Sequence, residues 1–169
     1  MSEPEAGRPI IPEGYGVTTS LEGMLPWSWV EEALTRSRNY WIVTAGGSGW
    51  PHAAPVWGVW SDGALYFSTG RDSRKARNLS TNPRLVVHLE SGDDAVILRG
   101  RAREADDRAA LVRADALYAA KYPNPDGDGF HLPTEPGGPD PVFVLRPSVA
   151  LAWREHDFPT SATRFSFDR

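Results

Sequence analysis

The sequence predicts a mainly β fold, an antiparallel barrel with a few helices outside it. Seven short segments are rich in β-branched and aromatic residues, and several follow one another through tight turns such as GGSG (46–49), SDG (61–63) and SGDD (91–94). Hairpin order of this kind is typical of an antiparallel sheet. No glycine fingerprint of a parallel nucleotide-binding unit follows any of these segments.

The first half of the chain is predicted to form a helix and then a three-stranded meander. Pro26 suits a first helical turn, and Trp27, Val30 and Leu34 follow at helical spacing, so we expect a helix at about 26–38. Three strands are expected after it, at 40–45, 50–60 and 64–69.

A short helix is expected after the third strand of the meander. Asp72 or Ser73 can cap the segment SRKARNLS (73–80). Asn82-Pro83 ends it, because the residue before a proline is pushed out of the α region. The sequence therefore predicts a corner at which a strand passes directly into a helix.

The second half of the chain predicts four more strands and a helix. The strands are expected at 84–90, 95–104, 142–153 and 161–167, and the alanine-rich helix at 105–122. Alternation along 95–104 places Ile97, Arg99, Arg101 and Arg103 on one face. That arginine face is expected to reach solvent or an anion.

The chain is expected to form one domain. Residues 1–24, with early prolines and acidic residues, are predicted to be a flexible N-terminal segment, and residues 25–169 to be the barrel domain. Within that domain, the Pro- and Gly-rich segment 123–141 is predicted to be a loop. A loop of this length is a lid, a binding loop or disordered.

Composition excludes several classes of function. A net charge of −4 argues against bulk affinity for nucleic acid or membranes, and there is no cysteine for a disulfide or a thiolate site. No signal peptide and no run of eighteen apolar residues is present, so we expect a cytoplasmic protein. No metal site is predicted, because the four histidines (His52, His88, His131 and His156) are scattered.

One basic stretch stands out in this acidic chain. Residues 71–84 carry a formal charge of +4, with Asp72 as their single acidic residue. Ser68 and Thr69 offer hydroxyls at the strand end, and the free N–H groups of a helix N-terminus lie beside Arg74 and Lys75. Together these groups predict a phosphate site. The alternative is a solvated basic helix whose charges keep the protein soluble.

Two quoted stretches carry a family resemblance. YFSTGRDSRKARNLSTNPR (66–84) and the preceding PHAAPVWGVWSDGALYF (51–67) resemble the pyridoxamine 5′-phosphate oxidase-like, FMN-binding split β-barrel family. The resemblance covers about 25–104 well and the later strands more loosely. It implies a six- to eight-stranded antiparallel split β-barrel that forms a homodimer, with two flavin-type cofactors bound in grooves between the subunits.

The resemblance also implies a set of cofactor-binding residues. Arg74 and Lys75 match the phosphate-binding pair of the Ser-Arg-Lys helix start that Ser73 opens, and Ser68 and Thr69 match strand-end positions that touch the phosphate. The segment beside the cofactor ring is matched by His52, Pro55, Val56 and Trp57, and the two later positions that reach the ring by Trp153 and Arg164. A core aromatic and a surface arginine are the alternative interpretation of Trp153 and Arg164.

One departure argues against the activity of the oxidases that give the family its name. Those enzymes hold their substrate with an arginine and a histidine just before the last arginine, whereas this chain has Thr160, Ser161, Ala162 and Thr163 before Arg164. A buried substrate phosphate would lack a cation there, so oxidation of vitamin B6 is not expected.

The resemblance implies an oxidoreductase that transfers hydride to or from a small organic substrate. The cofactor is FMN or the deazaflavin coenzyme F420, and the arginine-rich composition suits the deazaflavin branch of the family. No catalytic side chain is predicted, because the cofactor ring carries the chemistry. The alternative function is a non-catalytic flavin or deazaflavin carrier or sensor of the same fold.

Overall fold

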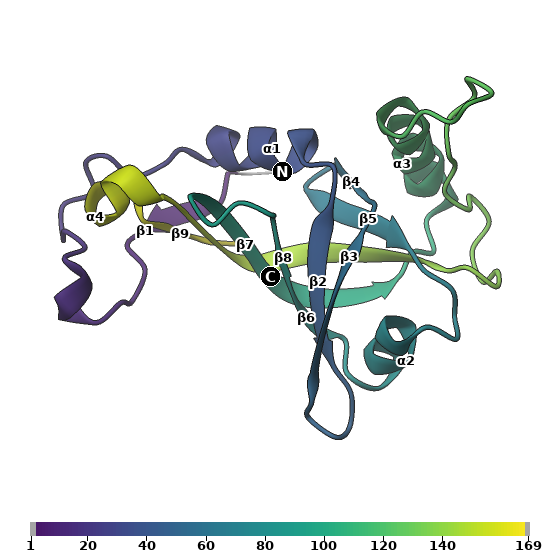
Figure 1. Cartoon of the computed structure of the whole chain (residues 1–169), viewed down its shortest axis with the longest axis horizontal. Helices are drawn as coiled ribbons and strands as arrows, with labels where there is room; N and C mark the ends of the chain where they lie inside the picture. The colour runs from purple at the N-terminus through teal and green to yellow at the C-terminus, as the bar shows by residue number, and fades with distance from the viewer. Residues whose placement is uncertain (1–2, 168–169) are drawn as a thin grey trace.

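The computed structural model describes residues 3–167 and shows a mainly β fold flanked by helices (Figure 1). The strands are β1 (Glu5–Gly7), β2 (Tyr40–Ala45), β3 (Pro51–Val56), β4 (Val59–Ser61), β5 (Ala64–Ser68), β6 (Arg84–His88), β7 (Asp94–Glu104), β8 (Val142–Arg154) and β9 (Thr163–Ser166). The helices are α1 (Trp27–Arg36), α2 (Arg74–Thr81), α3 (Arg108–Lys121) and α4 (Phe158–Ser161), with 3-10 turns at Glu13–Tyr15 and Glu155–Asp157.

The nine strands within residues 3–167 belong to one sheet with antiparallel pairing. The order is β1-β9-β8-β7-β6-β2-β3, and β5 pairs with β8 while β4 pairs with β5. This confirms the predicted fold class. The structure has two strands more than the seven that the sequence predicted. The segment 50–60 forms two strands, β3 and β4, and a further short strand, β1, forms near the N-terminus.

Strand β8 is the shared element of the sheet. One of its edges pairs with β7 from Phe143 to Arg154 with a bulge at Ser148, and the other edge pairs with β5 over Val142–Leu145 and with β9 over Val149–Ala152. Pro147 lies between these two stretches and has no N–H to donate, and the register against β7 shifts at Arg99 and Gly100. The bulge therefore marks the point at which β8 changes partner.

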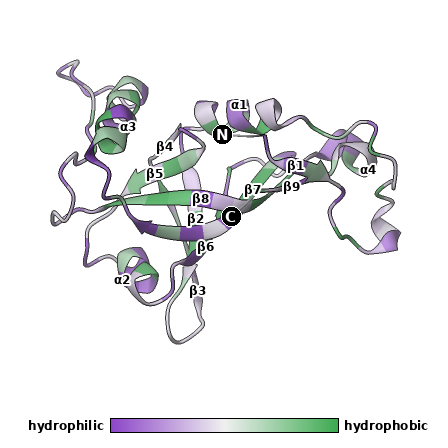
Figure 2. Ribbon diagram, turned by 180° about the vertical axis from the view of Figure 1, so that it is seen from behind, coloured by the Kyte–Doolittle hydropathy of each residue, from purple (hydrophilic) through white to green (hydrophobic). Residues whose placement is uncertain are grey.

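Alternation along the strands produces two hydrophobic cores. Leu65, Phe67 and Leu145 point into the barrel, where they pack with residues of α1, α2 and the other strands. Tyr66 and Val144, one position away, face outward against α3. β5 and the first part of β8, which are buried on both faces, are strongly hydrophobic in Figure 2.

The expected strand at 50–60 breaks at Trp57 and Gly58. The backbone of Gly58 pairs with side chains from the end of α3, because its N–H donates to the Tyr122 hydroxyl at 3.0 Å and its carbonyl accepts from Lys121 at 3.1 Å. A Cβ at Gly58 would lie 2.8 Å from the carbonyl oxygen of Tyr66. Only glycine fits this close approach.

The N-terminal residues contain elements that the sequence did not predict. β1 pairs with β9, with Ala6 opposite Phe165. The guanidinium of Arg8 donates to four backbone carbonyls, at 2.6–2.8 Å, those of Ser20, Glu22, Thr160 and Ala162. The segment after β1 is thereby fastened to α4, far away in the sequence.

Residues 123–141 contain neither helix nor strand, and they are fastened to α3. The carboxylate of Asp115 accepts from the backbone N–H of Leu132 at 2.7 Å and pairs with His131 at 3.0 Å, which raises the pKa of that imidazole. The described part of the chain, residues 3–167, has no helix with the length and hydrophobicity that crossing a bilayer requires.

We predict that Gly58→Ala destabilises the protein by about 1–3 kcal/mol, because the added methyl group overpacks against the backbone of β5. The measurement is the midpoint of urea unfolding. Gly47→Ala is the matched control, since a Cβ at Gly47 meets nothing within 4 Å. Equal midpoints for the two variants would contradict the close approach at Gly58.

Candidate functional site

The predicted strand-to-helix corner is present and internally hydrogen-bonded. Ser73 is the N-cap of α2, and its hydroxyl oxygen accepts from the N–H of Ala76 at 3.2 Å and from the Thr69 hydroxyl at 3.0 Å. Among residues 3–167, the Ser73 hydroxyl donates to no acceptor of its own. We call Ser68, Thr69, Ser73, Arg74 and Lys75 the cradle.

The hydroxyl of Ser68 has a different role from that of Ser73. It is shared between the carbonyls of Asp140 and Pro141, at 3.2 and 3.3 Å, which continues the pairing of β5 with the chain that leads into β8. Thr69 adds a backbone N–H bond to Pro141 at 3.4 Å. Ser68 therefore shapes the floor of the cradle, and Ser73 is the hydroxyl free to meet a ligand.

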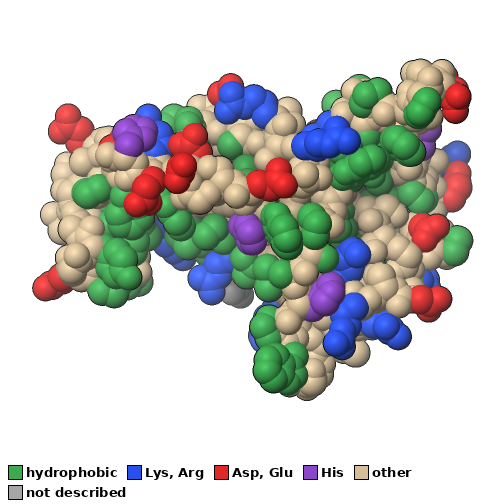
Figure 3. Space-filling model, viewed as in Figure 1, with side chains coloured by type: hydrophobic (Ala, Val, Ile, Leu, Met, Phe, Trp, Pro, Cys, Tyr) green, Lys and Arg blue, Asp and Glu red, His purple; other side chains and the backbone are tan. Residues whose placement is uncertain are grey.

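Positive charge and free N–H groups coincide at the start of α2. The amides of Arg74 and Lys75 lie in the first turn, where a helix has no acceptor of its own, and Arg74 is exposed while Lys75 is half-buried. Figure 3 shows Lys and Arg side chains gathered over α2. The guanidinium of Arg71 instead forms a bidentate ion pair with Glu104, at 2.8 and 3.1 Å.

His52 shares the face of the sheet that α2 covers. In the β2–β3 register it lies opposite Thr44, whose hydroxyl accepts from Asn78 of α2 at 3.0 Å. Directly opposed residues of an antiparallel pair point to the same side. The Nδ1 atom of His52 is buried and has no hydrogen-bond partner among residues 3–167. The link to Asn78 places His52 nearer the middle of α2 than its cationic start.

The other residues predicted to follow the cofactor ring lie in different environments. Val56 is buried in the barrel, and Pro55 is exposed on the opposite face of β3. Trp57 stacks on Tyr122 with centroids 4.6 Å apart, with Phe130 against its edge at 5.3 Å and the Arg38 guanidinium over it at 5.3 Å. Trp57 is thus held where α3 meets the 123–141 loop.

Trp153 and Arg164 lie in a separate pocket of about 670 Å³. Its walls come from the N-terminal residues, from β8 and from α4, and none of the cradle residues lines it. Ser68 pairs with Val142 at the start of β8, and Trp153 lies near the other end of the same strand. At about 3.3 Å per residue, the two ends are roughly 36 Å apart along β8. Figure 1 accordingly shows α2 and α4 at opposite ends of the sheet.

The sequence did not point to the cluster around Lys121. Its Nζ lies 2.8 Å from the Tyr40 hydroxyl and 3.1 Å from the Gly58 carbonyl, and burial lowers its pKa to about 8. Its signal in the sequence was a lysine at the end of an alanine-rich helix. This cluster fixes the break between β3 and β4 and, with it, the position of Trp57.

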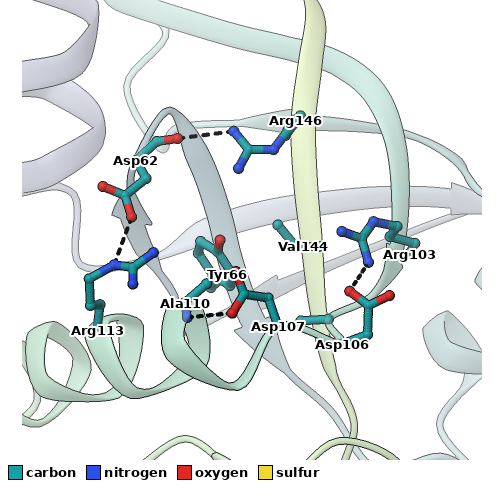
Figure 4. Close-up of a pocket in the computed structure, with 10 residues that line it drawn as sticks. Asp62, Tyr66, Arg103, Asp106, Asp107, Ala110, Arg113, Val144 and Arg146 are labelled. Atoms are coloured by element: carbon teal, nitrogen blue, oxygen red, sulfur yellow. Dashed lines mark hydrogen bonds and ion pairs between the residues drawn. The ribbon is translucent and has the colours of Figure 1, made fainter. Parts of the chain in front are cut away.

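A second pocket, of about 870 Å³, lies between the β4–β5 turn and α3 (Figure 4). Its charged groups are satisfied within the chain. Arg113 pairs with Asp62 at 3.1 Å, Arg103 pairs with Asp106, and Asp107 caps α3 through the N–H of Ala110. We attribute these groups to the junction of sheet and helix. Within residues 3–167 no group of three or more His, Cys, Asp or Glu side chains could hold a metal ion.

A comparison with models of known protein families identifies the family of this chain. A family model described as pyridoxamine 5′-phosphate oxidase matches residues 29–153, well over half of the chain. This protein belongs to the pyridoxamine 5′-phosphate oxidase family. The match includes the β3–β5 meander, the cradle and β8 up to Trp153. No curated protein matches the chain.

Solved structures support the fold of this family member. An F420 reductase is 21% identical with a TM-score of 0.52, and the match covers 71% of this chain and 94% of the reductase. An FMN-binding protein from Nostoc punctiforme, related to pyridoxamine 5′-phosphate oxidase, is 14% identical with a TM-score of 0.55, covering 86% and 98%. The heme storage protein HutZ of Vibrio cholerae is 16% identical with a TM-score of 0.55, covering 71% and 88%.

We predict that Ser73→Ala lowers the free energy of unfolding by about 1 kcal/mol, because α2 loses its cap and Thr69 loses an acceptor. Ser73→Asp retains a capping oxygen and should keep most of the stability. Ser80→Ala is the matched control, since Ser80 is exposed and its hydroxyl donates to the Arg77 carbonyl within the same helix. A Ser73→Ala protein as stable as Ser80→Ala would show that the cap is not needed.

Proposed function

We propose that this protein is an oxidoreductase that uses FMN or the deazaflavin coenzyme F420 for hydride transfer with a small organic substrate. The observation that carries the proposal is the cradle. It combines a helix N-terminus, the free hydroxyl of Ser73 and the cations of Arg74 and Lys75 on the face that holds the unpartnered Nδ1 of His52. This donor set fits a phosphate monoester or diester joined to a polar ring.

Each group of the cradle has a definite task in this proposal. The amides and side chains of Arg74 and Lys75 neutralise the phosphate, and Ser73 donates its hydroxyl proton to a phosphate oxygen. His52 lies in the segment that the resemblance places beside the ring system. The bound cofactor supplies the hydride chemistry, so the chain needs to supply position, charge and exclusion of water.

We further propose that the working unit is a homodimer. The resemblance implies that Trp153 and Arg164 reach the same cofactor as the cradle, yet the two sets lie at opposite ends of β8. A groove that joins the cradle of one protomer to Trp153 and Arg164 of its partner brings both sets to one ligand. Two such grooves follow from the symmetry of a dimer.

The chain around Arg164 supports a substrate other than pyridoxamine phosphate. The carbonyls of Thr160 and Ala162 accept hydrogen bonds from Arg8, and the Ser161 hydroxyl donates to the carbonyl of Arg154 at 3.1 Å. The polar groups of residues 160–163 are therefore used in bonds within the chain. None of these four residues carries a positive charge that could pair with a substrate phosphate.

A second candidate function is a carrier or sensor that binds the same cofactor without turnover. It is favoured by the heme storage protein among the structures of this fold. Reoxidation of the reduced cofactor separates the two candidates. An oxidoreductase should be reoxidised by some members of a panel of quinones, nitro compounds and enones, and a carrier by none of them.

We predict that the double variant Arg74→Gln, Lys75→Gln weakens cofactor binding at least tenfold. Loss of one hydrogen bond to a charged group is worth about 1.5–3 kcal/mol, and about 1.4 kcal/mol corresponds to a factor of ten in affinity. Fluorescence titration with FMN and with coenzyme F420 measures the effect.

Arg36→Gln is the control for this test, because Arg36 is an exposed residue of α1 paired with Glu32. It should leave both affinities unchanged. If neither cofactor binds the unaltered protein, the proposed function is wrong. If one binds and the double variant binds it equally well, the phosphate lies outside the cradle.

A further inference from the structure

Three exposed arginines lie side by side across three neighbouring strands. Arg84 of β6 is directly opposite Arg101 of β7, and Arg101 is directly opposite Arg146 of β8. The three strands are adjacent in the sheet (Figure 1). Directly opposed residues of antiparallel strands point to the same side, with Cβ atoms about 4.5–5.5 Å apart. We call Arg84, Arg101 and Arg146 the arginine row.

The bulge in β8 places Arg146 in this row. If the register of the half of β8 that begins at Val149 continued without a break, Arg146 would turn to the buried side of the sheet. The extra residue at Ser148 shifts the register by one, so that Arg146 lies opposite Arg101. A Cβ on Gly100 would lie 2.7 Å from the carbonyl oxygen of Arg146, so the bulge also requires glycine there. Bulges that re-aim a side chain are common beside functional sites.

The described chain leaves much of the positive charge on this face without a partner. The sequence predicted an arginine face along β7, and of its members Arg103 pairs with Asp106. The guanidinium groups of three other arginines form no hydrogen bond or ion pair with residues 3–167, namely those of Arg84, Arg99 and Arg101. Like charges that are directly opposed destabilise a sheet. Residues that conflict with the stability of the fold are typical of functional sites.

The arginine row lines a pocket of about 780 Å³, together with Arg99. We call it the arginine pocket. Val43 and Val86 contribute an apolar base, and no Asp or Glu of residues 3–167 lines the pocket. Its volume lies within the range of small-molecule sites. None of the cradle residues lines it, because the cradle is at the start of α2 and Arg84 follows the end of that helix. Eight helical residues separate the two sites by roughly 12 Å.

We propose that the arginine pocket binds a compact anion of the diphosphate class. A diphosphate has several negative oxygens close together, so it can meet more than one guanidinium at once, and a guanidinium can bind two phosphate oxygens side by side. The charge of the anion offsets the repulsion between the opposed arginines. The site does not depend on the proposed function, in which the cofactor phosphate is bound by the cradle.

Isothermal titration with inorganic diphosphate tests this proposal, with sulfate as the smaller anion for comparison. The titration uses the unaltered protein and the Arg74→Gln, Lys75→Gln protein, in which the cradle no longer competes for the anion. We expect both proteins to bind diphosphate at least tenfold more tightly than sulfate. Arg101→Gln, added to the double variant, should weaken diphosphate binding at least tenfold. No measurable binding of diphosphate, equal binding of sulfate, or full affinity after Arg101→Gln would overturn the proposal.

Thermal unfolding gives a second readout that a structural role of the row would move in the opposite direction. Without added anion, Arg101→Gln removes repulsion from two neighbours, so its midpoint should equal or exceed that of the unaltered protein. Diphosphate should raise the midpoint of the unaltered protein and leave that of Arg101→Gln unchanged. A lower midpoint for Arg101→Gln without anion would show that the row serves the fold and would contradict the proposal.

Matched variants separate the row from general effects of charge. Arg84→Gln should weaken diphosphate binding as Arg101→Gln does. Arg36→Gln removes an exposed cation that is paired with Glu32 on α1, so it should bind diphosphate with unchanged affinity. If Arg36→Gln loses as much affinity as Arg101→Gln, the anion responds only to net charge and the proposal fails.

A titration with ADP separates two sources of a diphosphate group. Tighter binding of ADP than of inorganic diphosphate would identify the ligand as a nucleotide, and weaker binding would identify it as free diphosphate. Both results support the anion site if Arg101→Gln reduces them. A protein that binds diphosphate through Arg101 but binds neither FMN nor coenzyme F420 would overturn the redox function alone. The opposite result would overturn the arginine pocket alone.

Discussion

Strand β8 changes its pairing partner half-way along one edge, from β5 to β9, while its other edge stays on β7. Pro147, which cannot donate to a ladder, lies at the change. The half paired with β5 leads back to the carbonyls that hold Ser68 and Thr69. The half paired with β9 carries Trp153. One strand thus sets the distance between the cradle and the pocket that contains Trp153 and Arg164.

The two ends of β8 differ in the ligand chemistry they favour. At one end, a helix N-terminus with Arg74 and Lys75 is suited to a phosphate, which needs fixed donors and positive charge. At the other, an apolar floor with aromatic walls is suited to a flat ring. In the proposed function, the phosphate and the ring of a flavin-type cofactor account for the two kinds of chemistry.

Local signals predicted the corner well. Ser73 caps α2 and Asn82 ends it as the sequence indicated, because capping and the restriction before proline act within a few residues. The break at Gly58 was not predictable in this way, since it depends on the Tyr122 hydroxyl, 64 residues away. The position of the segment after β1 depends on hydrogen bonds from Arg8 to carbonyls more than 150 residues later. No periodicity in residues 1–24 reports such contacts.

The central claim is that one cofactor groove takes its cradle from one protomer and Trp153 and Arg164 from its partner. Mixed dimers test it directly, with Arg74→Gln, Lys75→Gln in one protomer and Trp153→Ala, Arg164→Gln in the other. Such a dimer has one groove with all its residues intact and one groove with none. We expect cofactor titration to give one tight site per mixed dimer, whereas dimers of either variant alone give none. Absence of the tight site in the mixed dimer would contradict a groove shared between protomers.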